Sequence, residues 1–191
     1  LSEADAPPLQ VSTLVEVLEW HVRIHPNRPH LYFYGDHDVA EEISYAQLYT
    51  GATAVAAGLQ EHGLQHGQTV AIMLPTSLDF FYSFYGVLLA GGVPVPLYPP
   101  ARLSQIEDHL RRQASILDSA RASVLITVAE GTRLARLLGA QAEDLRSIVT
   151  VQELSSGGDG HAAPTLQSED VAFLQYTSGS TSFPRGVVIT Q

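Results

Sequence analysis

The sequence contains no cysteine, and this absence excludes several kinds of site at once. A disulfide scaffold, a thiolate zinc site and a cysteine nucleophile all require a thiol, so none of them can be present. A chain without thiols is compatible with a reducing compartment, and we expect a cytoplasmic protein.

Basic residues are also scarce, with 10 Lys and Arg against 20 Asp and Glu, which gives a formal net charge of −10. A chain of that charge is repelled by phosphate backbones and by anionic lipid. We therefore expect no nucleic acid partner and no binding to a membrane surface. A local basic site can still bind an anion inside an acidic protein.

One stretch, residues 80–101, has no charged residue and is long enough to be considered a membrane span. Glycines and prolines interrupt it. Pro94 and Pro96 suit an extended segment, because proline lacks the N–H that a helix needs and clashes with the preceding turn. We therefore expect no membrane span but a buried helix followed by a buried strand.

Predicted strands and helices alternate along the chain. The runs 69–74, 93–97 and 123–128 are apolar throughout, which is typical of strands that are buried on both faces. Capping patterns precede the predicted helices, as in Ser44-x-x-Gln47 and Ser104-x-x-Glu107. This alternation predicts an α/β fold with a largely parallel sheet flanked by helices on both faces.

A first helix is expected after Ser12 or Thr13, with Leu14, Val17, Leu18 and Val22 on its apolar face. The Gly- and Ser-rich segment 155–165 is a possible internal linker. The chain stops within a strand-like run, residues 186–190. We therefore expect residues 1–191 to be the N-terminal portion of one larger domain.

The stretch 176–186 carries the candidate chemistry. Five of the six residues in 177–182 have hydroxyl groups and the sixth is Gly179, whose backbone freedom allows successive N–H groups to face an anion. Arg185 adds a fixed charge that suits phosphate oxygens. The candidate nucleotide-binding residues are Thr177, Ser178, Gly179, Ser180, Thr181, Ser182, Pro184, Arg185 and Gly186.

Apolar runs flank this stretch, so we expect it to be a loop between two strands. The Walker pattern does not fit, because Pro184 stands where that pattern needs glycine, and the G-x-S-x-G pattern does not fit either. Composition alone favours a flexible linker instead.

The order of the residues resembles the phosphate-binding signature of the adenylate-forming superfamily, Y-T-S-G-S/T-T-G-x-P-K-G. Residues 176–181, Pro184 and Gly186 match it, whereas Ser182 stands for a glycine and Arg185 for a lysine. Three further segments, 43–48, 67–72 and 91–100, look like other motifs of that superfamily. Segments 96–100 and 173–176 are most similar to fatty acyl-AMP ligases.

The resemblance implies ATP and Mg²⁺ as cofactors, a fatty acid as substrate, and transfer of the acyl group to an acyl carrier protein or to coenzyme A. It also implies that the catalytic residues lie beyond residue 191, so that this chain is inactive alone. Three alternatives remain: a long-chain acyl-CoA ligase, an amino-acid or aryl-acid adenylation domain, and a non-catalytic nucleotide-binding module.

Two weaker patterns were weighed. His21 and His25 share one helix face, as zinc ligands often do, but no third ligand is evident and no metal site is predicted. An aromatic group on the predicted helix 78–90 is expected to be core packing, with an acyl channel as the alternative; its members are Phe80, Phe81, Phe84 and Tyr85.

Overall fold

The computed structural model describes residues 11–34, 40–99, 106–157, 160–177 and 184–191. The described helices are α1 (Leu14–Ile24), α2 (Tyr45–Glu61), α3 (Leu78–Leu89), α4 (Ile106–Ala120), the short 3₁₀ helix η3 (Ala129–Gly131), α5 (Thr132–Gly139) and α6 (Val151–Ser155). The described strands are β1 (Pro29–Tyr34), β2 (Ala40–Ser44), β3 (Thr69–Met73), β4 (Val93–Pro96), β5 (Val124–Thr127), β6 (Ser147–Val149), β7 (Val171–Thr177) and β8 (Arg185–Thr190).

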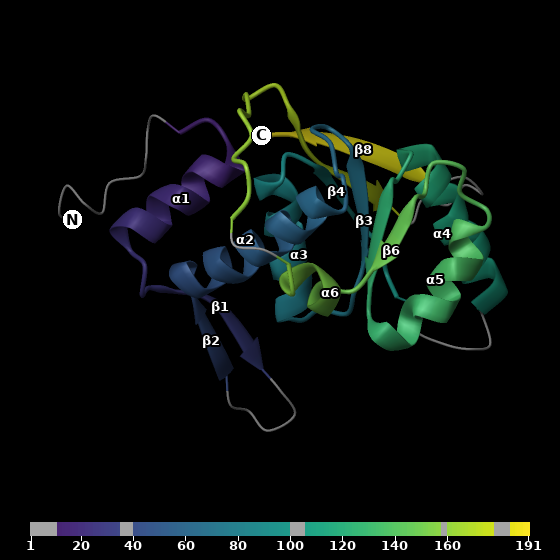
Figure 1. Ribbon diagram of the computed structural model, residues 1–191, viewed down its shortest axis with the longest axis horizontal. Coiled ribbons are helices and arrows are strands. Elements are labelled where there is room, and N and C mark those ends of the chain that lie inside the picture. Colours follow the sequence, from purple (N-terminus) through teal and green to yellow (C-terminus); the bar gives the residue numbers. More distant parts are fainter. Residues whose placement is uncertain (1–10, 35–39, 100–105, 158–159, 178–183) are drawn as a thin grey trace.

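A parallel sheet in the order β4-β3-β5-β6 forms the centre of the molecule. Figure 1 shows α2, α3 and α6 on one side of this sheet and α4 and α5 on the other. The predicted α/β architecture, with a parallel sheet between two helical layers, is therefore confirmed.

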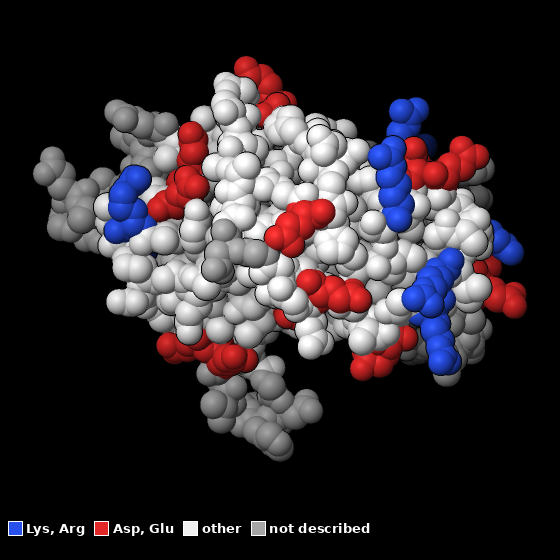
Figure 2. All heavy atoms as spheres, viewed as in Figure 1, with Lys and Arg blue, Asp and Glu red and all other residues white. Residues whose placement is uncertain are grey.

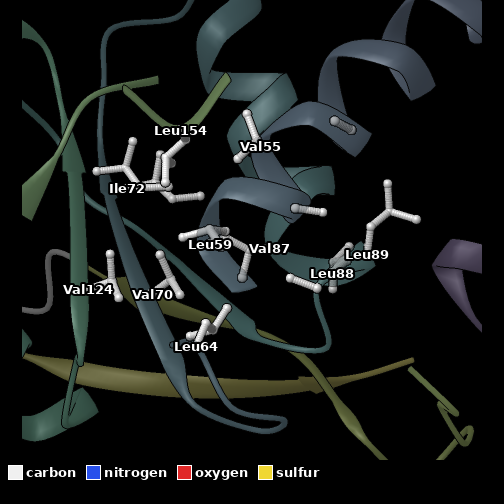
Figure 3. Packing of buried hydrophobic residues seen from close by; sticks show 14 of the residues in the cluster. Val55, Leu59, Leu64, Val70, Ile72, Val87, Leu88, Leu89, Val124 and Leu154 are labelled. Atoms are coloured by element: carbon white, nitrogen blue, oxygen red, sulfur yellow. The ribbon is translucent and has the colours of Figure 1, made fainter. Parts of the chain in front are cut away.

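The side chains of β3 show why its sequence is apolar throughout. Val70 and Ile72 pack with α2, α3 and α6, whereas Ala71 and Met73 pack with α4 and α5. Successive side chains of a strand point to opposite faces, so a strand covered on both faces needs apolar residues at every position. Figure 3 shows Val70 and Ile72 beside side chains from the first helical layer.

Helices α2 and α3 approach each other closely within that first layer. Gly86 of α3 faces Val55 of α2, and a Cβ added at position 86 would lie only 2.7 Å from the Val55 Cβ. Leu59 of α2 and Val87 of α3 then lie side by side over the sheet, both fully buried (Figure 3). Each such side chain contributes roughly 1.5–3 kcal/mol of transfer free energy.

Two of the predicted helix starts can be compared with the structure. The capping box at Ser44 is confirmed, because its Oγ accepts from the Gln47 N–H and Gln47 Oε1 accepts from the Ser44 N–H. Thr13 caps α1 in the same way with Glu16. The second predicted capping box begins at Ser104, which lies outside the described residues.

The predicted apolar face of α1 was wrong in part. Val15 and Leu18 are buried, whereas Leu14 is 37% exposed. Val15, Leu18 and Val22 form an equally regular helical stripe, and the packing of α1 against α2 and α3 selects that stripe.

The uncharged stretch 80–101 forms most of α3 and all of β4, as predicted. No helix in the described part of the chain is long and apolar enough to cross a membrane.

Two strand pairs lie outside the parallel sheet. Strands β1 and β2 form an antiparallel pair, and so do β7 and β8. Strand β7 also lies against β4, at the end of the parallel sheet. The described part of the linker-like segment is fixed to α2, because the Gln60 side chain both donates to and accepts from the backbone of Ala162.

Candidate functional site

The candidate nucleotide-binding residues lie at the turn of the β7–β8 pair. Thr177 is paired with Arg185, and Tyr176 with Gly186. Thr177, Arg185 and Gly186 were predicted in a loop, but they belong to the strands because the antiparallel register continues to the end of β7. Pro184 immediately precedes β8. The remaining predicted residues, Ser178, Gly179, Ser180, Thr181 and Ser182, lie outside the described residues.

Helix α4 contacts the end of β7 at two consecutive residues. The hydroxyl groups of Ser119 and Tyr176 are hydrogen-bonded at 2.9 Å. Arg112 Nη2 donates to the carbonyl oxygen of Thr177 at 3.0 Å. Sequence reasoning missed both contacts, because neither α4 residue belongs to a recognisable motif and each lies far from β7 along the chain.

An apolar pocket of about 500 Å³ opens at the carboxyl ends of β3 and β4. In parallel α/β sheets this is the edge at which ligands usually bind, and the volume lies in the range of small-molecule sites. Its lining residues are Leu74, Pro75, Thr76, Phe80, Phe84, Pro96, Leu97, Tyr98, Pro99, Phe173 and Gln175.

The aromatic residues of α3 separate into two groups. Phe80 and Phe84 line the pocket, and the ring of Phe84 contacts that of Phe173 with 5.6 Å between centroids. Phe81 and Tyr85 instead pack in the cluster beneath α1 and the β1–β2 pair. The expectation of core packing is therefore confirmed for all four residues, and Phe80 and Phe84 in addition form a wall of the cavity.

Strand β7 connects the pocket to the candidate nucleotide-binding segment. Phe173, Gln175 and Thr177 are alternate residues of β7 and so share one face. Phe173 and Gln175 line the pocket, and Thr177 ends the strand. Leu174 and Tyr176 point to the other face, where they pack with the α4 and α5 cluster. The pocket and the candidate phosphate site are therefore neighbours along a single strand.

The histidines weighed as metal ligands have other contacts. The ring of His21 stacks on Tyr45 with 4.2 Å between centroids, and His30 stacks on the same tyrosine at 4.3 Å. Burial lowers the pKa of His21, as do, to a smaller extent, the positive charges of His25, Arg28 and His30. Burial also lowers the pKa of His30.

Within the described ranges, no group of three or more histidine or carboxylate side chains is arranged to hold a metal ion. We therefore assign none of the described residues to Mg²⁺.

Comparison with known proteins matches residues 18–191 to the family described as AMP-binding enzyme. A probable long-chain-fatty-acid–AMP ligase of Mycobacterium tuberculosis is 34% identical over 157 residues, which cover 80% of this chain and 26% of the relative. A medium-chain-fatty-acid–[acyl-carrier-protein] ligase of Moorena producens is 30% identical over 189 residues, covering 95% of this chain and 31% of the relative.

Solved structures give the same relationship. One from a study of fatty acyl-adenylate ligases of E. coli and L. pneumophila has a TM-score of 0.84 and 30% identity, and the match covers 98% of this chain and 32% of that one. A fatty acyl-adenylate ligase of L. pneumophila in complex with acyl adenylate and pyrophosphate has a TM-score of 0.76, 28% identity, and coverage of 95% and 31%.

The chain thus spans between about a quarter and a third of the length of these relatives. The superfamily inferred from the motifs is confirmed by sequence and by fold. Because the family match extends over nearly all of its residues, the chain belongs to the AMP-binding enzyme family.

Proposed function

We propose that this chain is part of a fatty acyl-AMP ligase, which activates a fatty acid with ATP to give an acyl-adenylate. The acyl group then passes to the phosphopantetheine thiol of an acyl carrier protein. The observation that carries the proposal is the shared face of β7, on which Phe173 and Gln175 line an apolar pocket and Thr177 ends the strand, where the predicted phosphate-binding segment begins.

In the proposed reaction, a carboxylate oxygen forms a bond to the α-phosphorus of ATP while the bond from that phosphorus to the pyrophosphate oxygen breaks. The protein must place the two reactants side by side and hold the triphosphate. A hydrocarbon chain in the pocket and phosphates at the end of β7 give this arrangement. Arg185, opposite Thr177, supplies a charge for the β- and γ-phosphates.

The lining of the pocket favours a fatty acid over a small polar acid. Three phenylalanine rings, from Phe80, Phe84 and Phe173, face the cavity together with Leu74 and Leu97. Each buried methylene group contributes about 0.8 kcal/mol, so four extra methylenes improve binding by roughly 200-fold. We expect activity to rise steeply with chain length until the cavity is full.

The acceptor is supported by similarity. The relative from Moorena producens is named as a ligase that joins a medium-chain fatty acid to an acyl carrier protein. The relative from Mycobacterium tuberculosis is named as a probable long-chain-fatty-acid–AMP ligase. We propose that the residues for Mg²⁺ and for catalysis belong to parts of the enzyme that correspond to the later two thirds of these relatives. The 191-residue chain should therefore be inactive by itself.

The test is fatty-acid-dependent exchange between ATP and labelled pyrophosphate, measured on the complete parent protein and on the 191-residue chain. We expect exchange by the complete protein with a long-chain acid and none by the chain alone. Stimulation only by an aryl or amino acid would replace the fatty acid in the proposal. No exchange with any acid would instead support a non-catalytic nucleotide-binding module.

A second assay identifies the acceptor. The complete protein first forms the acyl-adenylate from ATP and the fatty acid. Either a holo acyl carrier protein or coenzyme A is then added, and the thioester product is measured by mass spectrometry. Acyl carrier protein thioester is the expected product. Formation of acyl-coenzyme A alone would identify a long-chain acyl-CoA ligase.

A further inference from the structure

We propose that Arg112 of α4 is a positioning residue for nucleotide binding. It holds the end of β7 through the carbonyl group of Thr177 and so fixes the point at which the phosphate-binding segment begins. This inference rests on the proposed function, and it adds to the site a residue that lies outside the phosphate-binding motif.

The first observation is the hydrogen bond itself. Arg112 Nη2 lies 3.0 Å from the Thr177 carbonyl oxygen, although the two residues are 65 positions apart in the chain. A hydrogen bond from a charged donor is stronger than one between neutral groups. Thr177 is the last residue of β7 and pairs with Arg185, so a restraint on Thr177 also restrains Arg185.

The second observation is that α4 holds β7 at a neighbouring residue as well. Ser119 bonds to the Tyr176 hydroxyl, about two helical turns along α4 from Arg112. Helix α4 is a firm support because Ala114 and Leu117 are buried against the sheet. The end of β7 is thus fastened at two points to a packed helix.

The packing at this junction is incomplete. A cavity of about 170 Å³ separates α4 from β4 and β7, and Arg112 and Tyr176 both line it. Two buried polar atoms near it, His109 Nε2 and Gln113 Oε1, have no hydrogen-bond partner in the described part of the chain. Because the packing leaves a gap at this position, the hydrogen bonds from α4 add a restraint to the side-chain contacts of Leu174 and Tyr176.

The charge around Arg112 also suits an anionic ligand. Residues 106–149 contain six basic and six acidic residues, whereas the rest of the chain contains four basic and fourteen acidic ones. Figure 2 shows most of the visible basic side chains on the side of the molecule that carries α4 and α5. Arg112 forms no ion pair within the described ranges, so no carboxylate neutralises its charge by direct contact.

The experiment compares variants of the complete protein in the pyrophosphate exchange assay. Arg112→Ala removes the hydrogen-bond donor, whereas Arg112→Lys keeps a charged donor in the form of a more compact ammonium group. Arg111→Ala is the matched control, because Arg111 is the adjacent residue of α4 and is exposed, with only an ion pair to Asp108 at 3.8 Å. Melting temperature and the KM for the fatty acid are measured alongside.

For Arg112→Ala we expect kcat/KM for ATP to fall about 10-fold or more, with the KM for the fatty acid unchanged. The melting temperature should stay within a few degrees, because exposed substitutions change stability little. Arg112→Lys should recover most of the loss, and Arg111→Ala should match wild type. If Arg112 acts by positioning the β7–β8 end, the losses of kcat/KM for ATP in Arg112→Ala and Arg185→Ala should not be additive in the double variant. Both substitutions then affect one phosphate-binding unit.

Three results would overturn the proposal. The first is an unchanged kcat/KM for ATP in Arg112→Ala. The second is a loss that merely follows a lowered melting temperature. The third is full additivity with Arg185→Ala, which would mean that Arg112 acts independently of the β7–β8 end.

Failure of the proposed function is recognised separately, because the wild-type protein would then show no exchange. In that case, amide hydrogen exchange of peptides covering 171–191 still tests the positioning contact. Faster exchange in Arg112→Ala than in wild type and Arg111→Ala supports it, and equal exchange in all three overturns it.

Discussion

The ring of Tyr176 lies over Gly186, its partner across the β7–β8 pair. A Cβ built at position 186 would lie 2.9 Å from the Tyr176 Cζ and 3.2 Å from its hydroxyl oxygen. Gly186 is not among the described glycines with positive φ, so space and not backbone conformation requires glycine here. The ring cannot easily move away, because Tyr176 is only 8% exposed and bonds to Ser119.

Gly186→Ala should therefore lower both stability and nucleotide binding. We expect the free energy of unfolding to fall by about 1–3 kcal/mol, as for overpacked core sites, because the added methyl group must displace the Tyr176 ring. Denaturant unfolding measures the first effect, and kcat/KM for ATP in the complete protein measures the second.

Val187→Ala is the control for this substitution. Val187 follows Gly186 in β8 and is 48% exposed, so its truncation should change stability by about 0.5 kcal/mol or less. If Gly186→Ala were as stable as wild type, the ring of Tyr176 would have to be free to move. That result would contradict the inference that a fixed Tyr176 ring requires glycine at position 186.

Gly58→Ala should destabilise the protein even though alanine favours a helix. Gly58 lies in α2, and a Cβ there would overlap the carbonyl oxygen of Leu154 and lie 2.6 Å from its Cα. Leu154 is fully buried, so α6 cannot move without opening the core. We expect a net loss of about 1–3 kcal/mol by chemical denaturation.

Helix propensity alone makes the opposite prediction for Gly58→Ala, a gain of about 1 kcal/mol. A stabilised variant would therefore show that α2 and α6 are not in close contact. Because the obstacle is backbone, truncating Leu154 to alanine should not relieve the loss.

Much of the fold could be predicted from local sequence because local rules and tertiary packing agree. The runs 69–74 and 93–97 are apolar throughout, and they became β3 and β4, buried on both faces. Capping at Ser44 depends only on residues three apart, so it could be recognised without the rest of the chain.

The features that were missed depend on length or on distant contacts. Helix α6 has five residues, too few to show a helical period, although Thr150-x-x-Glu153 is a capping box that marks its start. The apolar face predicted for α1 included Leu14 and omitted Val15, because the packing that buries Val15 involves residues distant in the chain. The contact of Arg112 with Thr177 has no local signal of any kind.

Stability should fall with acidification because the half-buried histidines His21 and His30 favour their neutral forms. Burial lowers the pKa of both His21 and His30, whose rings each stack on the ring of Tyr45. The unfolded chain then binds more protons than the folded one below the unperturbed histidine pKa of about 6.5. The stabilisation is complete above that pH and is lost as the pH falls below it.

His21→Phe tests this pH dependence, because phenylalanine can still stack on Tyr45 but cannot take up a proton. The slope of unfolding free energy against pH between about 5 and 6.5 should be smaller in the variant than in wild type. His66→Gln, which removes a histidine outside the stack on Tyr45, serves as the control and should keep the wild-type slope. An equal slope in all three proteins would contradict the expectation.

The two aromatic pairs of α3 give the sharpest test of the acyl pocket. Phe84 lines the pocket, whereas Phe81 packs against Phe33 with 5.6 Å between ring centroids. Both are half-buried phenylalanines of one helix. Phe84→Ala should lower kcat/KM for a long-chain acid by about 5- to 30-fold, since roughly 1–2 kcal/mol of apolar contact with the acyl chain is lost. The KM for ATP should not change.

Phe81→Ala is the matched variant, with the same truncation at a position of α3 that does not line the pocket. It should lower the melting temperature, because it leaves a cavity beneath the β1–β2 pair, but kcat/KM for the acid should stay near wild type. Equal losses of acid activity in the two variants would mean that the truncations act through stability. In that case the pocket beside β7 would not be the acyl site, although the phosphate-binding assignment at Thr177 and Arg185 would be unaffected.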